Sequence, residues 1–396
     1  MNKKLMAVAV AGAFAAPAAA LAQASNVQIY GTIYAEYAYA QQGAIAAGYL
    51  VKADLLQAPG SEIGFKGEEA LGGGLSAWFQ CTSSAGNLGA ATSFNPGSVF
   101  CSRNSAIGLK GSWGNAYVGN WDMPFKKVAG TVRIVSDTGI WGAGPMLFGG
   151  SATTNGRSAA QTWSRRQNSS LFYDTPVWNG FQVYTGISTP STAGELASTA
   201  NTSGAKSRMW SLAASYTNGP LYVMGAYENH ANFQPAVASV GAAGTIAGND
   251  NAWLVGAAYQ FGPVTVGALY SKQKYETTLV TNADVSVWNI AVDWKIQGPH
   301  ELLIGYTKAN NTGGSFGAVG AGTIMGNRVY NAGGGATGGN IWQVEYQYWL
   351  SKRTRLSGGY IRLQNDTNAN YSLGGLTVPK GGENQDGFAV SIKTTF

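Results

Sequence analysis

The sequence predicts an all-β fold, a 16-stranded antiparallel transmembrane β-barrel with short periplasmic turns, long extracellular loops and a third loop folded inward. Segments that alternate apolar and polar residues recur along the chain, and the connections between them are alternately short and long. The composition is rich in Gly (56), Tyr (20), Phe (14) and Trp (12), whereas only 11% of the residues are charged. Strands with one face toward lipid and the other toward water have this composition.

The amino-terminal residues predict export. Lys3 and Lys4 precede an apolar run that ends in a small-residue cleavage site at Ala22. We therefore expect a signal peptide over 1–22 and a single barrel over 23–396. No later apolar run approaches the roughly 20 residues that a membrane-spanning helix needs.

The order of the strands follows from the alternation. In the first strand Val27 and Ile29 share one face, while Gln28 and Thr32 share the other. The connections hold Gly, Pro, Asn or Ser, which are typical of turns and loops. The sixteen predicted strands cover 26–39, 53–68, 75–80, 105–111, 115–121, 169–176, 181–188, 208–216, 221–228, 253–261, 264–270, 288–296, 302–306, 342–350, 354–364 and 388–396.

A soluble β-sandwich or propeller is the alternative architecture. It needs an apolar interior shared between packed sheets. Here the apolar faces carry Tyr and Trp near the strand ends, which suits aromatic girdles at two lipid interfaces. These residues are Tyr259, Tyr270, Trp294, Tyr306 and Tyr348. A closed barrel of this many strands is too wide for side chains to fill, so the sequence predicts an aqueous channel.

Two cysteines, Cys81 and Cys101, flank a Gly-, Ser- and Asn-rich segment that has the composition of a loop. Because exported proteins commonly oxidise such pairs, we expect a disulfide at the base of this loop. The alternative is a pair of unrelated buried thiols.

The composition offers little for other chemistry. His230 and His300 are far apart and lack the spacing of metal ligands, so neither a metal site nor a cofactor is expected. Because they fall in a predicted loop and at a predicted turn, no catalytic triad is visible and an enzyme is not expected. The 25 Lys and Arg residues against 19 Asp and Glu form no basic block, so no nucleic-acid partner is expected.

The longest irregular segment is 122–165, which contains many glycines and two prolines. Loops of this length inside a compact chain are usually functional or disordered. We expect it to fold into the lumen, where its charged groups narrow and polarise a water-filled pore; the alternative is a solvated surface loop. The charged and aromatic residues in and beside it are Trp121, Asp122, Phe125, Lys126, Lys127, Arg133, Asp137, Trp141, Phe148, Arg157, Trp163 and Arg165.

Five segments carry a family resemblance: GFKGEEALGGGLSAWFQ (64–80), GLKGSWGNAYVGN (108–120), YDTPVWNGF (173–181), WLSKRT (349–354) and the last strand, which ends in Phe396. They resemble the general-diffusion porins of Gram-negative bacteria, especially the β-proteobacterial type. The resemblance implies a homotrimer among lipid and lipopolysaccharide in the outer membrane, with the third loop as a constriction opposite basic wall residues. It also implies that the disulfide-bounded loop latches onto a neighbouring subunit, and that the barrel-assembly machinery reads Phe396.

Two positions depart from the pattern of that family. Glu62 stands where many relatives have an arginine, and Gly119-Asn120-Trp121 replaces a common Gly-Arg-Gln at the start of the third loop. Relatives project cations into the pore from both positions, so these departures weaken the expected preference for anions.

Several basic residues remain to line the pore. Arg103 and one of Arg165 or Arg166 match basic positions of the family, and strand alternation places Lys66 and Lys110 on the inner face. The expected constriction charges are Glu62, Lys66, Arg103, Lys110, Asp122, Lys126, Lys127, Arg133, Asp137, Arg165 and Arg166.

These residues predict an outer-membrane channel for passive diffusion of small hydrophilic solutes and ions, with a weak preference for anions. Basic rings favour anions and acidic rings favour cations. One alternative is a substrate-specific channel for sugars or organic acids, which needs an aromatic track that Trp121, Trp141 and Trp163 could supply. Two further alternatives are a barrel enzyme and a purely structural or adhesive barrel.

Overall fold

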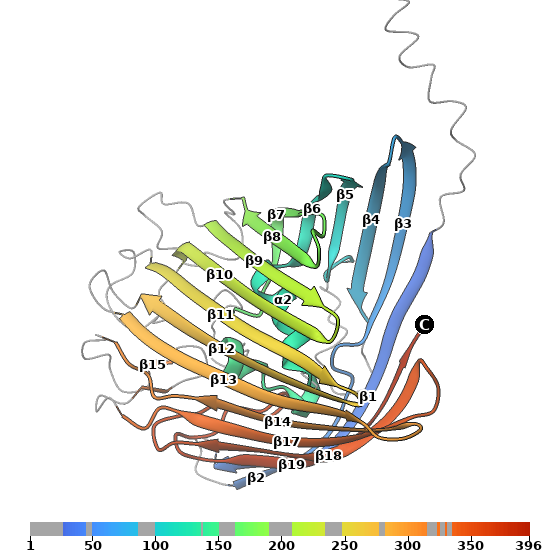
Figure 1. Cartoon of the computed structure of the whole chain (residues 1–396). Helices are drawn as coiled ribbons and strands as arrows, with labels where there is room; N and C mark the ends of the chain where they lie inside the picture. The colour runs from blue at the N-terminus through green and yellow to red at the C-terminus, as the bar shows by residue number, and fades with distance from the viewer. Residues whose placement is uncertain are drawn as a thin grey trace, which may run out of the picture.

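The computed structural model describes residues 27–44, 50–85, 100–135, 138–149, 163–189, 208–233, 248–276, 282–314, 323–324, 329–330 and 335–396. The expected signal peptide over 1–22 lies outside the described residues, as do Asp137 and Arg157. Strands dominate what is described; all but two short ones, which pair with each other, form one large sheet that closes on itself (Figure 1).

The elements follow one another along the chain with few helices. The strands are β1 (Gln28–Ala44), β2 (Leu50–Gln57), β3 (Glu62–Gly72), β4 (Leu75–Ser84), β5 (Ser105–Gly111), β6 (Gly114–Asp122), β7 (Arg166–Asp174), β8 (Phe181–Ser188), β9 (Arg208–Asn218), β10 (Leu221–Phe233), β11 (Gly248–Phe261), β12 (Val264–Glu276), β13 (Asn282–Lys295), β14 (His300–Ala309), β15 (Thr323–Ile324), β16 (Val329–Tyr330), β17 (Gly339–Trp349), β18 (Thr354–Asn365) and β19 (Gln385–Thr395). The helices are α2 (Pro124–Arg133), η2 (Gly139–Trp141) and α3 (Gly144–Phe148). Within the described ranges, none of the helices has the length and apolarity to cross a membrane.

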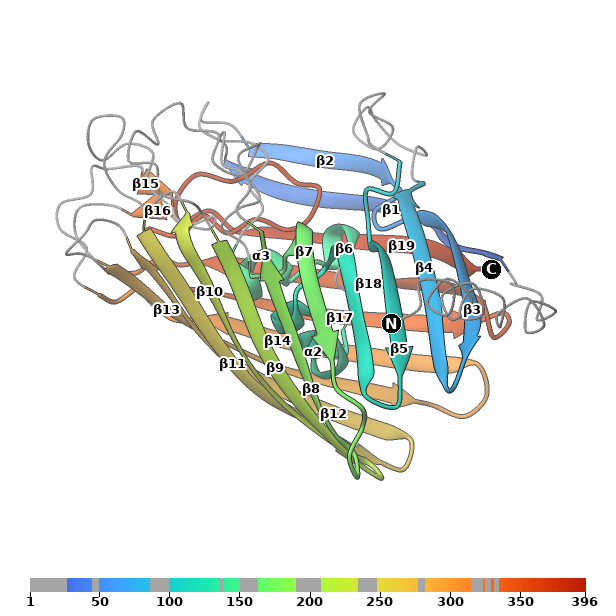
Figure 2. The ribbon, with the colours of Figure 1, turned by 90° about the horizontal axis from the view of Figure 1, so that it is seen from above.

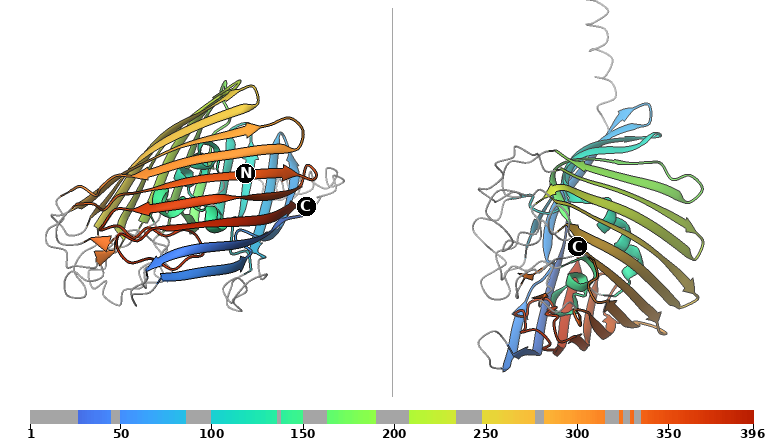
Figure 3. Two further views of the ribbon diagram at one scale, coloured as in Figure 1. Left: turned by 90° about the horizontal axis from the view of Figure 1, so that it is seen from below. Right: turned by 90° about the vertical axis from the view of Figure 1, so that its left-hand side faces the viewer.

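The large sheet is a closed barrel of sixteen strands, as predicted, because β2 and β3 together make one barrel strand. One half of β1 pairs with β2 and the other half pairs with β3. The interruption follows from Pro59, which has no backbone N–H to donate, and from Gly60, whose φ is +75°. Pairing of β1 with β19 from Thr32↔Thr395 to Gln41↔Asp386 closes the ring. Figure 3 shows the ring from two further directions.

Short turns lie at one end of the barrel and longer connections at the other. Gly219, Gly262 and Gly298 occupy three of the turns with positive φ, which glycine adopts without steric cost. A longer connection follows most of the remaining strands, but only five residues separate β12 from β13, over 277–281. This asymmetry is that of short periplasmic turns and long extracellular loops.

The two faces of the wall have opposite chemistry. In β17, Trp342, Val344 and Tyr346 are exposed, whereas the alternate residues Gln343 and Glu345 are buried. The same alternation exposes apolar side chains around the barrel, including Ile63, Ile107, Val118, Leu171, Leu212, Val255, Ile290, Ile304, Leu356, Phe388 and Val390. An apolar outer band and a polar interior are the arrangement that a lipid bilayer requires of a barrel.

The third loop folds inward, as predicted, and lies along part of the inner wall. Helix α2 contacts strands β8 to β13, and α3 contacts β13 and β14. Phe125, Val128 and Val132 of α2 are buried, because they recur at helical spacing on the side that faces the wall. Figure 2 shows α2 and α3 between the strands on opposite sides of the barrel. The loop therefore fills one side of the lumen.

The last long connection, over 366–384, also packs inward and meets the third loop. Tyr371 and Leu373 are buried, and the backbone N–H of Leu373 donates to Gln385 Oε1 at 2.8 Å. A side chain added at Gly374 would meet the backbone oxygen of Gly139, so the two loops touch at their backbones. This contact holds the third loop from the extracellular side.

Oxidation of Cys81 and Cys101 is confirmed, with the two Cα atoms 4.7 Å apart. We expect the double variant Cys81→Ser/Cys101→Ser to lose about 3 kcal/mol of unfolding free energy, because the bond closes a loop of about 20 residues in the unfolded chain. Urea unfolding in phospholipid vesicles measures the change. The entropic origin would be contradicted if reduction lowered the unfolding free energy of the wild type while the double variant kept the unfolding free energy of the oxidised wild type.

Candidate pore constriction

The tip of the third loop is anchored to β1 through the buried carboxylate of Glu36. This carboxylate accepts hydrogen bonds from the backbone N–H of Ile140 at 2.8 Å, from Tyr34 Oη at 2.6 Å and from Gln57 Nε2 at 2.7 Å. Gly139 precedes the contact with φ +64°, and a Cβ there would lie 2.3 Å from Glu36 Oε1. Only glycine lets the loop backbone approach this closely.

The returning arm of the loop is anchored to β10 and β12. Trp163 stacks on His230 with ring centroids 4.3 Å apart, and its indole N–H donates to Tyr275 Oη at 2.8 Å. Tyr275 donates in turn to Gln273 Oε1, and Gln273 Nε2 donates to the carbonyl of Leu147 at 2.6 Å. The loop is therefore bound to the wall at both ends of its inner course.

The burial of two tryptophans overturns part of the sequence interpretation. Trp141 and Trp163 are 0% exposed, so they cannot form the lumenal aromatic track that a substrate-specific channel needs. Trp141 packs beside Gly359 on β18, and Trp163 packs in the anchor just described. Both rings hold the loop to the wall by burying apolar area.

A cluster of charges forms where the chain leaves β6 for the loop. Asp122 forms an ion pair with Lys126 at 2.7 Å and another with Arg166 at 3.2 Å. Asn104 joins the same group, because its Nδ2 donates to Asp122 at 3.0 Å and its Oδ1 accepts from Arg166 Nε at 2.5 Å. Burial is the largest influence on Lys126 and lowers its pKa, while the carboxylate of Asp122 opposes that effect.

A second pair continues this cluster across the wall. Arg103 Nε lies 2.6 Å from Glu62 Oε2, and Arg166 lies within electrostatic reach of both residues. The side chains of these three ion pairs remain 21–30% exposed, so water and ions reach them. We call Glu62, Arg103, Asp122, Lys126 and Arg166 the constriction cluster; it holds three cations and two carboxylates.

Sequence reasoning missed further charges beside this cluster. Lys393 on β19 lies within electrostatic reach of Glu62, of Arg355 on β18 and of Glu345 on β17. Strand alternation could have predicted that Lys393 faces inward, because its neighbour Ile392 is exposed on the outer face. The three strands thereby extend the charged inner surface by two cations and one carboxylate.

The other expected constriction residues make their contacts with residues outside the cluster. Lys66 stands over the ring of Tyr30 at 5.1 Å, Lys127 pairs with Asp174 at 2.7 Å, and Arg133 stands over the ring of Phe148 at 5.6 Å. Lys110 pairs with Glu68 near a periplasmic turn, with about half of each side chain exposed. Arg165 is buried and donates to Gln167 Oε1 at 2.6 Å.

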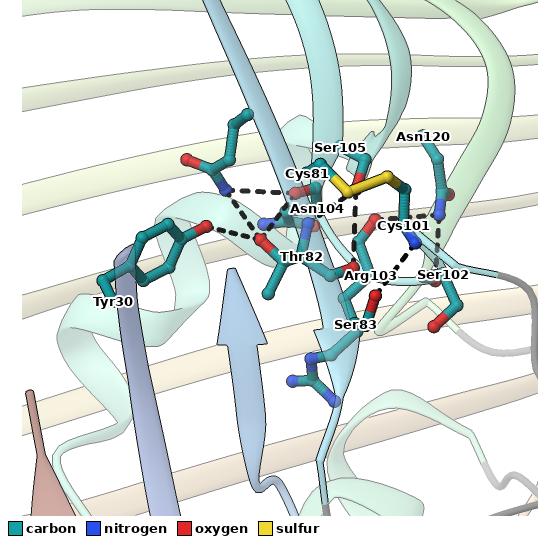
Figure 4. The surroundings of a disulfide bond; sticks show 11 residues. Tyr30, Cys81, Thr82, Ser83, Cys101, Ser102, Arg103, Asn104, Ser105 and Asn120 are labelled. Atoms are coloured by element: carbon teal, nitrogen blue, oxygen red, sulfur yellow. Dashed lines mark hydrogen bonds between the residues drawn. A yellow bond between two sulfur atoms is a disulfide. The ribbon is translucent and has the colours of Figure 1, made fainter. Parts of the chain in front are cut away.

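The disulfide lies next to the constriction cluster. Figure 4 shows Arg103 extending away from the bridge between Cys81 and Cys101, while Asn104 and Thr82 bond around it. Thr82 Oγ1 donates to the carbonyl of Asn104 at 2.9 Å and shares a 2.5 Å hydrogen bond with Tyr30 Oη. These bonds and the bridge fix the strand ends that carry Arg103.

Comparison with known proteins supports the same fold and setting. The sequence profile of the family described as Gram-negative porin matches residues 7–368 of this chain. The chain belongs to the Gram-negative porin family. Outer membrane porin protein 32 of Delftia acidovorans is 26% identical to this porin over 401 residues, covering 100% of both chains. This porin is therefore an outer-membrane diffusion channel.

Solved porin structures share the barrel. The anion-selective porin from Comamonas acidovorans superposes with a TM-score of 0.71 at 19% identity, covering 94% of this porin and 100% of that chain. The trimer form of OmpT from Vibrio cholerae superposes with a TM-score of 0.61 at 14% identity, covering 94% and 100%. At these identities the likeness shows the fold alone.

The Glu36 anchor predicts a looser loop when it is removed. Glu36→Ala leaves the buried N–H of Ile140 and the amide of Gln57 without their acceptor, which costs about 1–3 kcal/mol for an unsatisfied buried donor. We expect larger open-channel current fluctuations in planar bilayers and faster proteolysis within the loop. Glu69→Ala, at an exposed site on β3, is the matched control and should behave as wild type. Equal noise in both variants would show that the anchor does not hold the loop.

Proposed function

We propose that this porin passes small hydrophilic solutes and ions by passive diffusion with a weak preference for anions. The constriction cluster carries the proposal, because its partly exposed side chains have one more cation than carboxylate. An ion in the waist feels this excess, since the Debye length of about 8 Å at physiological salt is comparable to the width of a narrow pore. Basic charge lining such a waist favours anions.

The weakness of the preference has the same origin. Glu62 pairs with Arg103, and Asp122 pairs with both Lys126 and Arg166, so most of the cationic field is offset locally. Lys393, Arg355 and Glu345 add a further net charge of +1, which also favours anions. The anion selectivity of the Comamonas acidovorans porin agrees with the proposed direction.

The exposed side of α2 supports a water-filled path. Its wall-facing residues are buried, whereas Gly130 on the opposite side is exposed, and nothing lies within 4 Å of a Cβ built on Gly130. Lys126 and Lys127 also remain partly exposed on this helix. The solute path in this proposal runs between α2 and the wall formed by β3 to β6.

The proposal extends to the assembled protein. A homotrimer is supported by the trimer form of OmpT, which shares the fold, and by the broad apolar outer band. We assign the expected contacts with lipopolysaccharide to the outer surface. Recognition by the barrel-assembly machinery is assigned to Phe396, which is 48% exposed, while its backbone N–H and C=O both pair with Gly31 at 3.1 Å.

Charge substitutions in the constriction cluster test the selectivity. Glu62→Gln should raise the ratio of chloride to potassium permeability about twofold, and Arg103→Gln should lower it by a similar factor. One unit charge about 8 Å from an ion changes the energy of that ion by about 0.5 kcal/mol in water, and salt screening over one Debye length lowers this to about 0.2 kcal/mol. The change has opposite signs for chloride and potassium, so the two effects together give about a twofold change in the ratio. Reversal potentials in a potassium chloride gradient measure the ratio.

The control is Lys110→Gln, because Lys110 is paired and exposed near a turn, away from the cluster. It should leave the reversal potential unchanged. Cation preference in the wild type, or an equal shift in the control, would overturn the assignment of the waist to this cluster.

A further inference from the structure

Four aromatic rings form a continuous surface on the inner wall beside the constriction cluster. Trp78 lies 5.4 Å from Tyr117 and 5.7 Å from Trp121 between ring centroids, and Tyr117 lies 5.4 Å from Trp121. Phe172 stacks on Tyr117 at 5.0 Å. We call these four residues the aromatic shelf; they come from β4, β6 and β7.

The shelf faces the lumen and is only partly covered. Phe79 and Val118, the neighbours of Trp78 and Tyr117 along their strands, are exposed on the outer face, so alternation turns the shelf inward. Tyr117 and Phe172 are 4% exposed and form its base, whereas Trp78 and Trp121 are half-buried. Two indole rings therefore present apolar surface to an aqueous path.

The position of Trp78 is fixed rather than adaptable. Its indole N–H donates to Asn115 Oδ1 at 2.7 Å, so the polar end of the ring is held by the wall. Trp121 meets both Trp78 and Tyr117 edge to face, at interplanar angles of 71° and 70°. A rigid pair of rings can take up a flat solute without ordering itself first.

Cations adjoin the shelf directly. Trp121 immediately precedes Asp122, which binds Lys126 and Arg166. Gln80, two residues from Trp78 on the same face of β4, donates to the carbonyl of Asn104 at 3.1 Å, within the same network. The rings and the positive end of the constriction cluster thus lie side by side.

We propose that the aromatic shelf and the constriction cluster form a low-affinity subsite for aromatic carboxylates in the solute path. The ring of such a solute stacks on one of the two indoles, Trp78 or Trp121, with its edge against the other, and its carboxylate lies toward Arg166, Lys126 and Arg103. An aromatic contact contributes about 0.5–1.5 kcal/mol beyond the area that it buries. Guanidinium groups match the planar geometry of a carboxylate. This inference rests on the proposed diffusion path and adds a solute class to it.

The charge of the cluster selects this class over two others. A neutral sugar can stack on an indole but has no charge to pair with the excess cation of the cluster. An aromatic cation is attracted to an indole face but meets three cations against two carboxylates in the cluster. An aromatic anion satisfies both parts of the site at once.

Partial block of the potassium chloride current in planar bilayers tests the proposal on the wild-type porin. Sodium benzoate should reduce conductance at a concentration about tenfold lower than sodium acetate, which corresponds to about 1.4 kcal/mol. Cyclohexanecarboxylate, which matches benzoate in size and charge without an aromatic ring, should fall between them. Block by cyclohexanecarboxylate equal to that by benzoate, or stronger block by benzylammonium, would overturn the assignment.

Variants then locate the site. The double variant Trp78→Leu/Trp121→Leu should lose most of the tenfold difference between benzoate and acetate while still conducting potassium chloride. Trp113→Leu is the matched control, because Trp113 lies in a turn, stacked on Tyr173 and 42% exposed. A double variant that blocks as wild type does would refute the site. If the double variant does not insert, Trp121→Leu alone carries the same expectation with a smaller loss.

Loss of the subsite and loss of the diffusion path give different results. A porin that conducts potassium chloride but responds equally to benzoate and acetate has a diffusion path without the subsite. A purified chain that does not conduct at all contradicts the diffusion path itself, whatever the aromatic shelf binds.

Discussion

The structure depends on one constraint, that no backbone polar group can face lipid without a partner. Strands satisfy this only when the sheet closes, because an edge strand would leave a row of N–H and C=O groups in the hydrocarbon. Pairing of β1 with β19 provides that closure, and β2 and β3 share the other side of β1. The break at Pro59 is tolerated because Ser61 restores part of the bonding: its hydroxyl bonds to both the N–H and the carbonyl of Tyr34. Closure then leaves a wide interior that the chain itself must organise.

The third loop organises that interior by having two unlike sides. One side of α2 is apolar and buries itself against the wall, as a helix does in the core of a soluble protein. The other side keeps Gly130 exposed and Lys126 and Lys127 partly exposed to water. The loop is held by Glu36 on β1 and by Trp163 against β10. The packing of its apolar side against the wall therefore sets the width of the water-filled path on its other side. Selectivity and rigidity therefore share one physical basis.

Much of this architecture could be predicted from the sequence, because period-two alternation and the spacing of turns are local signals. The inward course of the loop followed from its length and composition, but its helices were missed. The pattern of Phe125, Val128, Ala129 and Val132 after Pro124 was sufficient to predict α2, since proline favours the first turn and the apolar residues recur at helical spacing. The fate of Trp141 and Trp163 could not be predicted in this way. Whether an aromatic ring in a loop faces the lumen or the wall depends on contacts with strands far away in the sequence.

The same limit applies to the charged residues, and it explains why the waist is only weakly basic. Alternation alone places Glu62 on the inner face, yet its partner Arg103 comes from the end of a different connection, 41 residues away. A carboxylate in that position weakens the field felt by a passing anion, but it also holds the guanidinium in one orientation. Conduction needs sites that attract an ion enough for it to enter and release it readily. A waist in which each cation has a nearby carboxylate meets both requirements, because the residual charge attracts anions while the pairing prevents any single cation from binding them tightly.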